Sequence, residues 1–162
     1  MAHPRGGQEL TTQVRRGGEG DRAYVLDLGR RVACDSVSSL RPGIPALVEL
    51  AYEKLVDFVM GQSHAILIAS NGERDLGFLL FLDSLPDEVS LSPQGFIAYM
   101  AVEPQARRHG VGSALLREAE TVARERGLAF IAMMVTEENR AARELYDRFG
   151  FQTERRLLCK AV

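Results

Sequence analysis

Apolar residues in the first part of the chain recur at helical spacing in two segments. The segment from Asp21 to about Asp35 begins with a residue suited to a helix N-cap, and its apolar positions share one face, at Tyr24, Val25, Leu28 and Val32. The segment from Pro45 to about Met60 begins with a residue suited to a first helical turn. We expect the apolar face of this second helix to be buried in the core, at Leu47, Leu50, Ala51, Leu55, Phe58 and Val59.

The segments around these helices have the spacing of strands. Residues 11–16 alternate weakly and predict a first strand, which a glycine-rich segment ends. His64 to Ala69 and Leu76 to Leu82 are apolar runs joined by a turn that contains Asn71-Gly72, and this arrangement favours a hairpin. The segment from Asp83 to Gln94 holds two prolines and several serines, so we expect a loop that is able to border a site.

The second half of the chain alternates strands with helices. We expect strands at Gly95 to Val102, Ala129 to Val135 and about Gln152 to Lys160, and helices at Ser113 to Arg126 and Asn139 to Phe149. The first two of these strands read FIAYMAV and AFIAMMV, and such apolar runs indicate strands buried on both faces. The helix between them carries its apolar residues on one side, at Leu115, Leu116, Ala119, Val122 and Ala123. The pattern predicts an α/β (α+β) fold with about four helices and a mixed, mostly antiparallel sheet that ends in a parallel strand pair.

Composition is typical of one soluble globular domain. The chain has 162 residues, of which 46% are apolar and 26% charged, with a formal net charge of −2. The near-neutral charge argues against a nucleic-acid partner, and no apolar run approaches the roughly 20 residues of a membrane helix. We expect residues 1–10 to be a disordered tail and residues 11–162 to form a single domain.

Cysteine and histidine residues give no indication of a metal site. Cys34 and Cys159 are far apart, and the histidines at 3, 64 and 109 lack metal-ligand spacing. Two such cysteines are by default reduced cytoplasmic thiols, and the first residues lack the apolar core of a signal peptide. The expected location is therefore the cytoplasm.

The clearest chemical signal is the glycine-containing loop Arg107-Arg108-His109-Gly110-Val111-Gly112, which joins a strand to a helix. A helix N-terminus has unpaired N–H groups and the positive end of the helix dipole, and both favour a phosphate. Glycines without Cβ atoms allow phosphate oxygens to approach the backbone. The P-loop and the dinucleotide-binding fingerprint both fail on spacing, because Gly112 is followed by Ser113-Ala114-Leu115, without a Lys-Ser/Thr pair or a third glycine.

The chain resembles the GNAT superfamily of N-acetyltransferases. The pattern of that family is a strand ending in Val-x-Pro, then (Gln/Arg)-x-x-Gly-x-(Gly/Ala) and a helix, and later Asn-x-x-Ala-x-x-Leu-Tyr and Gly-Phe. Here the first part ends with Arg107 to Gly112, and the second is Asn139 to Tyr146 followed by Gly150-Phe151. The match covers about Gly95 to Phe151, and both parts occur in the family's order.

The resemblance implies acetyl-CoA as co-substrate and a role for each matching segment. The N–H groups of Arg108, His109, Gly110, Val111, Gly112 and Ser113, in the loop that Arg107 opens, would hold the coenzyme A pyrophosphate. In this family the preceding strand is bulged and splays from its parallel neighbour, which opens a V-shaped slot. Backbone groups of Met100, Ala101 and Val102 would bind the pantetheine arm, and the N–H near Ala101 or Val102 would polarise the thioester carbonyl.

Asn139 and Tyr146 carry the remaining implied roles, as a pantetheine contact and as the acid that protonates the departing thiolate. Together with Ala142 they fall on one helix face, and a phenol with a pKa near 10 is protonated at neutral pH. Simpler roles stay open: Asn139 is also suited to cap its helix, and Tyr146 to be a core tyrosine. His109 contributes its backbone to the motif, and we expect no catalytic role for its ring.

Two departures from the family pattern stand out. The acidic residue that many relatives carry before the glycine loop is missing near Ala98-Tyr99, so the base is unassigned, with Tyr99 through water and Glu103, Glu137 and Asp83 as candidates. Only eleven residues follow Phe151, where most relatives have two strands, and an incomplete sheet edge would favour a homodimer.

The expected reaction is acetyl transfer to a primary amine by direct attack in a ternary complex, without a metal. The amine, in a small molecule or a peptide, is not identified by the sequence. The alternative is a sensor module that binds acyl-CoA without chemistry, and the near-neutral charge disfavours a nucleic-acid interaction domain.

Overall fold

The computed structural model describes residues 11–162, so the expectation for residues 1–10 lies outside the described part. The elements, in chain order, are β1 (Gln13–Arg16), α1 (Arg22–Val32), α2 (Pro45–Met60), β2 (His64–Ser70), β3 (Asp75–Leu82), β4 (Gly95–Val102), α3 (Val111–Glu125), β5 (Ile131–Met133) and α4 (Arg140–Arg148). Short 3₁₀ turns occupy Glu19–Asp21, Ala33–Ser36 and Pro104–Ala106.

The five strands form one sheet in the order β1-β2-β3-β4-β5. All neighbouring strands are antiparallel except β4 and β5, which are parallel. This mixed sheet with one parallel pair and four α-helices is the predicted fold class. In the part of the chain that the structure describes, no helix has both the length and the apolar character needed to cross a membrane.

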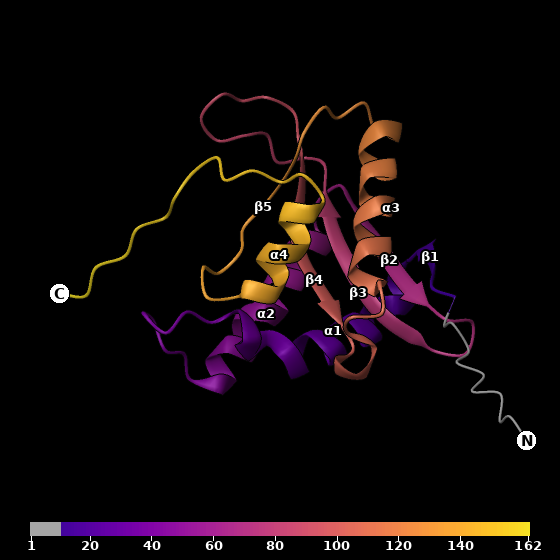
Figure 1. Cartoon of the computed structure of the whole chain (residues 1–162), viewed down its shortest axis with the longest axis horizontal. Coiled ribbons are helices and arrows are strands. Elements are labelled where there is room, and N and C mark those ends of the chain that lie inside the picture. Colours follow the sequence, from indigo (N-terminus) through magenta and orange to yellow (C-terminus); the bar gives the residue numbers. More distant parts are fainter. Residues whose placement is uncertain (1–10) are drawn as a thin grey trace, which may run out of the picture.

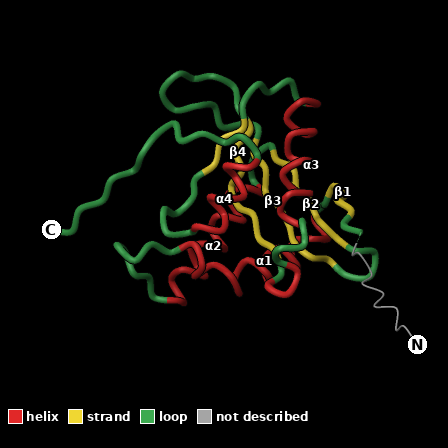
Figure 2. Tube along the Cα trace, viewed as in Figure 1, coloured by secondary structure: helices red, strands yellow, loops and turns green. Residues whose placement is uncertain are grey.

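Helices cover the sheet on both faces, with α1 and α2 on one side and α3 and α4 on the other (Figure 1, Figure 2). The side chains of β2 alternate between the two resulting cores. Leu67 and Ala69 pack with α3, whereas Ile66 and Ile68 pack with α1 and α2. Because side chains of a strand point alternately to opposite faces, a central strand between two helix layers is apolar throughout. The run at His64 to Ala69 is continuously apolar because both faces of β2 are covered by helices.

The apolar face predicted for the Pro45–Met60 helix is only partly buried. The buried residues of α2 are Tyr52, Val56 and Val59, whereas Leu47, Leu50, Ala51 and Phe58 are exposed. The expectation that these four residues belong to the core is therefore wrong. The helix turns the 52–56–59 face towards the sheet, which leaves a second apolar face on the surface of the molecule.

Of the two strands predicted near the end of the chain, one is shorter and less buried than expected and the other is absent. The expected strand from Ala129 to Val135 is buried on neither face: it pairs only over Ile131–Met133, and the side chains of Phe130 and Met134 are 62% and 73% exposed. The expected strand from about Gln152 to Lys160 is absent, because residues 152–162 run away from the body of the molecule without pairing (Figure 1). In consequence β5 is an edge strand.

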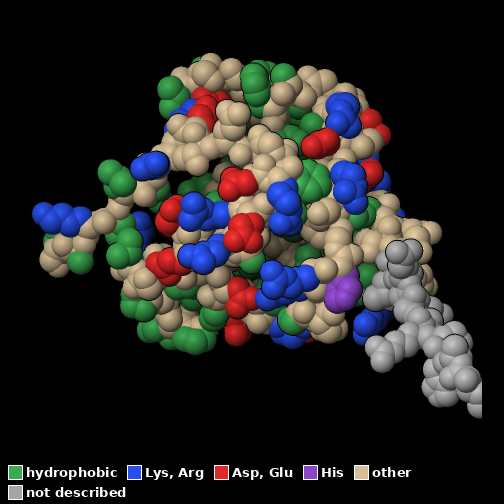
Figure 3. All heavy atoms as spheres, in the orientation of Figure 1, with side chains coloured by type: hydrophobic (Ala, Val, Ile, Leu, Met, Phe, Trp, Pro, Cys, Tyr) green, Lys and Arg blue, Asp and Glu red, His purple; other side chains and the backbone are tan. Residues whose placement is uncertain are grey.

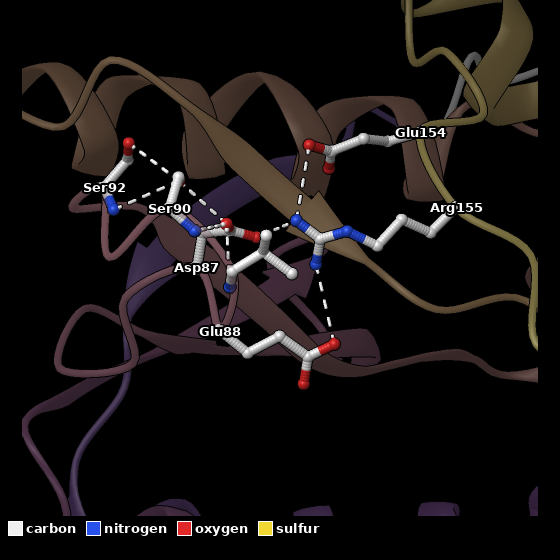
Figure 4. Close-up of polar contacts among 7 residues, drawn as sticks. Asp87, Glu88, Ser90, Ser92, Glu154 and Arg155 are labelled. Atoms are coloured by element: carbon white, nitrogen blue, oxygen red, sulfur yellow. Dashed lines mark hydrogen bonds and ion pairs between the residues drawn. The ribbon is translucent and has the colours of Figure 1, made fainter.

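Ion pairs of one residue, Arg155, tie this extended segment to the loop at residues 83–94. Arg155 pairs with Asp87, and Glu88 and Glu154 lie 3.6 Å from the guanidinium (Figure 4). Asp87 also accepts hydrogen bonds from the N–H groups of Ser90 and Val89 at 2.6 and 3.2 Å. These bonds, the Ser90 N–H first, and Arg155 hold the pKa of Asp87 below its ordinary value. The predicted loop is thus an ordered turn around one carboxylate.

Candidate active site

A slot opens where β4 and β5 separate. Pairing between the two strands ends at Ile97 and Met133, although β4 continues to Val102. The register of β4 against β3 shifts at Ala98, as expected of a β-bulge. The resulting cavity has a volume of about 160 Å³ and is lined by Ser36, Ile97, Ala98, Tyr99, Met100, Met133, Met134, Val135, Thr136, Asn139 and Tyr146. We call this cavity the slot.

The β4 wall of the slot has main-chain groups without strand partners. The N–H of Glu103 donates to the carbonyl of Leu76 at 2.8 Å, and in an antiparallel pair such hydrogen-bonded residues alternate with residues that face away. Ala101 therefore directs its N–H and C=O towards β3, whereas Met100 and Val102 direct theirs to the side that β5 has left. Of the three predicted backbone donors, the alternation favours Met100 and Val102 over Ala101.

The glycine loop ends at the N-terminus of α3. Gly110 is the N-cap residue in a left-handed conformation with φ of 81°, and no side chain caps the helix. The first intrahelical bond runs from the N–H of Ala114 to the carbonyl of Gly110 at 2.9 Å. The N–H groups of Val111, Gly112 and Ser113 precede this bond and are therefore free of intrahelical partners. A 15-residue helix with three such donors favours an anion at this end.

The side chains of Arg107 and His109 in the predicted loop form hydrogen bonds that hold the loop in place. Arg107 donates to Asp35 at 3.0 Å and to the carbonyl of Val102 at 3.3 Å, which fixes the loop against the α1–α2 connection. The His109 ring lies 2.8 Å from the carbonyl of Arg107. Arg108 is exposed, with φ of 65°. The loop residues do not line the slot, but they adjoin it, because a Cβ on Gly112 would lie 3.8 Å from the Met100 side chain and 3.0 Å from Leu145.

The α4 wall of the slot carries Asn139 and Tyr146. Asn139 is the N-cap of α4, and its Oδ1 accepts the N–H of Ala142 at 3.2 Å. The capping role is thereby confirmed, and the Asn139 amide nitrogen is left for a ligand. The Tyr146 ring is half-buried and packs edge-on against Phe151 at 5.9 Å. Burial raises the pKa of Tyr146 above its ordinary value, so its hydroxyl keeps its proton at neutral pH.

Contacts across one end of the slot join the α1–α2 connection to the segment after β5. The Thr136 hydroxyl donates to the carbonyl of Ser36 at 2.6 Å. Glu138 accepts from the N–H and the hydroxyl of Ser39, the latter at 2.7 Å, and these bonds lower the pKa of Glu138. Sequence reasoning missed Ser36 and Thr136 as slot residues, because only tertiary contact between segments 100 residues apart brings them together.

The carboxylates considered as bases are placed away from the slot or are already paired. Glu103 is 8% exposed, and both its oxygens accept from the guanidinium of Arg31, at 3.0 and 2.7 Å. Asp83 pairs with Arg126, and Glu137 is exposed beside Arg143. Tyr99 is the one of the four candidates that lines the slot. Among residues 11–162, no group of three or more His, Cys, Asp or Glu side chains is arranged to hold a metal ion.

Comparison with known proteins gives concordant results. The family model described as acetyltransferase (GNAT) family matches residues 39–151. GCN5-related N-acetyltransferase 7, chloroplastic, from Arabidopsis thaliana is 33% identical over 79 residues, which cover 43% of this chain and 29% of that relative. The chain thus spans less than a third of the relative's length.

Solved structures share the fold over nearly the whole chain. A protein from Pyrococcus furiosus assigned as an acetyl transferase is 26% identical, with a TM-score of 0.79 over 93% of this chain and 99% of that one. AAC(6')-Iy in complex with the bisubstrate analogue CoA-S-monomethyl-acetylneamine is 19% identical, with a TM-score of 0.67 over 93% and 97% of the two chains. At 19% identity the second likeness concerns the fold alone.

Proposed function

The chain belongs to the acetyltransferase (GNAT) family, and from this premise we propose that it transfers an acetyl group from acetyl-CoA to a primary amine. The observation that carries the proposal is the slot between the separated ends of β4 and β5, with free main-chain groups on one wall and the Tyr146 phenol on the other. At the nearby end of α3, three free N–H groups stand where an anionic group can bind.

Each part of the slot has a task in this reaction. The N–H groups of Val111, Gly112 and Ser113 bind the pyrophosphate, and the main chain of Met100 binds the pantetheine arm. The Val102 N–H polarises the acetyl carbonyl, as an oxyanion-hole donor does. Asn139 orients the arm through its amide nitrogen. The two tasks on α4 share one helix face because Asn139 and Tyr146 are seven residues apart.

The bond changes balance without a covalent enzyme intermediate. The amine nitrogen forms a bond to the acetyl carbon, the carbon–sulfur bond breaks, and the leaving thiolate takes a proton from Tyr146. The amine loses one proton to solvent, and Tyr146 takes one back from solvent, so the enzyme is restored. Neither Cys34 nor Cys159 lines the slot, which fits direct attack in a ternary complex.

A domain that senses acyl-CoA without chemistry is the alternative, since no carboxylate lines the slot. The two functions separate in one experiment: calorimetric titration with coenzyme A, followed by thiol release from acetyl-CoA in the presence of a panel of amines. An enzyme binds coenzyme A and releases thiol with at least one amine. Binding with no release for any amine would support the sensor.

Replacing Gly110 with Ala is expected to weaken coenzyme A binding about tenfold. The left-handed backbone at this position costs a residue with a Cβ roughly 1–2 kcal/mol. The helix N-terminus therefore shifts, and its N–H groups no longer point towards the same phosphate. The measurement is calorimetric titration with coenzyme A.

The matched control for this variant is Gly127→Ala. Gly127 has φ of 66° and open space around its Cβ position, as Gly110 does, but it follows the other end of α3. Both variants are expected to lose similar stability, and only Gly110→Ala to lose affinity. Equal affinity in the two variants would contradict a phosphate site at this helix end.

We also propose that a second copy of the chain covers the free edge of β5. The exposed Phe130 and Met134 flank this edge, and the extended segment carries the exposed Leu157 and Leu158. Unpaired strand edges with apolar side chains favour association. Sedimentation at micromolar concentration is expected to give twice the chain mass of 17.9 kDa. A monomer mass under those conditions would refute the dimer.

A further inference from the structure

The exposed apolar face of α2 does not end in solvent but leads into a second cavity. Leu47, Ala51 and Leu55 follow each other at four-residue intervals, so they lie in one row along the helix. Leu47 is 58% exposed at the outer end of this row. On the face shown in Figure 3, apolar side chains gather at the lower left, over the beginning of α2. Such a row needs an explanation, because only Leu55 at its inner end packs against the core.

The second cavity is lined by Ala33, Ser36, Val37, Val48, Ala51, Tyr52, Leu55 and Tyr99, and we call it the apolar pocket. None of these residues is charged. The ring centroids of Tyr52 and Tyr99 lie 4.7 Å apart in its wall. The Tyr52 hydroxyl already donates a hydrogen bond to the carbonyl of Val25 at 2.7 Å. The volume is about 230 Å³. Since a cavity of about 150 Å³ is known to hold benzene, this pocket has room for a phenyl or branched alkyl group.

Ser36 and Tyr99 line both the slot and the apolar pocket, so the two cavities meet at these residues. The Tyr99 hydroxyl is buried beside the Ser36 side chain, and its hydrogen-bonding capacity is not fully used among the described residues. A buried hydroxyl with spare hydrogen-bonding capacity is costly. A ligand nitrogen that displaces the Ser36 side chain from the Tyr99 hydroxyl would satisfy it. The junction therefore suits a molecule with a polar atom at Tyr99 and an apolar group in the pocket.

The charges around the junction do not suit a cation. The charged groups nearest to Tyr99 are Asp35 and Arg107, which pair with each other at 3.0 Å, beside the Cys34 thiol. Glu103 is held by Arg31, and Glu138 by Ser39. An ammonium ion moved here would lose its water and gain no carboxylate, and desolvation then favours the neutral amine.

Basicity decides which amines are neutral in solution. An α-amino group has a pKa of about 7.7–8.0 and a lysine side chain about 10.4. At pH 7.5 about a third of the former and about 0.1% of the latter is uncharged, a difference of roughly 200-fold. This factor is larger than the effect of one or two hydrogen bonds of about 1 kcal/mol each.

We infer that the acceptor is the α-amine of a residue with a large apolar side chain, whose side chain fills the apolar pocket while its neutral nitrogen lies at Tyr99. This inference rests on the acetyl transfer proposed above and names its acceptor. The carboxyl group of this acceptor is blocked, as in a peptide or an amino-acid amide. A free carboxylate would lie in the same apolar surroundings without a cation to pair with it. A peptide N-terminus and a free amino-acid amide share this chemistry.

The test measures thiol release by the full chain with four acceptors: phenylalanine amide, glycine amide, a peptide beginning with phenylalanine, and Nα-acetyl-lysine amide. Burial of a phenylalanine side chain contributes about 1.5–3 kcal/mol, so phenylalanine amide is expected to exceed glycine amide in kcat/KM by about 10- to 150-fold. Nα-acetyl-lysine amide is expected to be at least 100-fold poorer than phenylalanine amide at pH 7.5. With phenylalanine amide, kcat/KM rises about tenfold per pH unit below the amine pKa.

The possible outcomes separate the inference from the proposed function. A preference for the peptide over the amide identifies a peptide acceptor, and the reverse identifies a small molecule, both within the inference. A preference for the lysine side chain or for glycine amide overturns the inference and leaves acetyl transfer intact. Coenzyme A binding without transfer to any acceptor overturns both.

A pocket-filling variant tests the place of the side chain. Ala51→Phe puts a ring into the apolar pocket from an exposed position, so folding is preserved. It is expected to lower kcat/KM for phenylalanine amide about tenfold or more and to change that for glycine amide little. Ala46→Phe, the same change at an exposed position of α2 outside the pocket, is the control and keeps wild-type values. An equal loss for both amides in Ala51→Phe would refute the pocket as the side-chain site.

Discussion

Replacing Tyr146 with Phe is expected to lower the turnover of acetyl transfer by about 100-fold or more, while acetyl-CoA affinity changes little. A positioned general acid contributes about 10²- to 10⁴-fold, and the leaving thiolate has no other protonated group on the α4 wall of the slot. Burial raises the pKa of Tyr146, so the acid form is present at neutral pH and is lost only above pH 10. In the wild type, Tyr146 therefore stays protonated between pH 7 and 9, and deprotonation of this residue is expected to cause no loss of activity in that range.

The measurement is steady-state thiol release combined with calorimetric titration of coenzyme A. Tyr24→Phe is the matched control, because the Tyr24 hydroxyl is also buried but lies on α1, away from the slot, without a hydrogen-bond partner among the described residues. This control is expected to keep wild-type turnover and to be at least as stable, since it removes an unsatisfied hydroxyl. Unchanged turnover in Tyr146→Phe would show that solvent protonates the thiolate.

Replacing Gly29 with Ala is expected to lower the free energy of unfolding by about 2 kcal/mol. Gly29 is buried in α1, and a Cβ there would lie 1.9 Å from Cζ of Tyr52. Overpacking costs about 1–3 kcal/mol, and the displaced ring also loses its bond to the Val25 carbonyl, worth about 1 kcal/mol. The higher helix propensity of alanine returns at most about 1 kcal/mol, so the steric cost decides the sign.

Thermal unfolding measures this effect, and about 2 kcal/mol corresponds to a fall in Tm of roughly 4–8 °C for a chain of this size. Gly20→Ala is the control, because open space surrounds its Cβ position and its φ is not positive. Its Tm is expected to stay within about 2 °C of the wild type. If Gly29→Ala were as stable as Gly20→Ala, the Tyr52 ring would have to be free to move, and the wall of the apolar pocket with it.

The local parts of the structure could be predicted from the sequence because their causes are local. The Asn71-Gly72 turn joins β2 to β3, and the α3 residues placed on one face are all buried. The loop before α3 leaves three N–H groups free, as a glycine-containing helix start predicts. In α4 the helical period alone places Asn139 and Tyr146 on the same side, and both line the slot.

The burial predictions for α2 and β5 were wrong because an apolar side chain can be covered by more than one kind of neighbour. Apolarity shows that a side chain favours contact with other apolar groups, but not which groups these are. The row at Leu47, Ala51 and Leu55 therefore looked like core, but Leu47 is exposed, and Ala51 and Leu55 line the apolar pocket. The run at Ala129 to Val135 looked like a central strand and instead forms the sheet edge, because no segment after it pairs there.

By itself the sequence determined the family, the fold class and the free N–H groups at the start of α3, since each depends on residues close together in the chain. Only the tertiary structure decided what the slot is made of and what it adjoins. Separation of β4 from β5 brings Ser36, Tyr99 and Thr136 together, and Arg31 takes Glu103 out of consideration as a base. These contacts join residues up to 100 positions apart, and their pairing depends on packing two helix layers against one sheet, which no local pattern encodes.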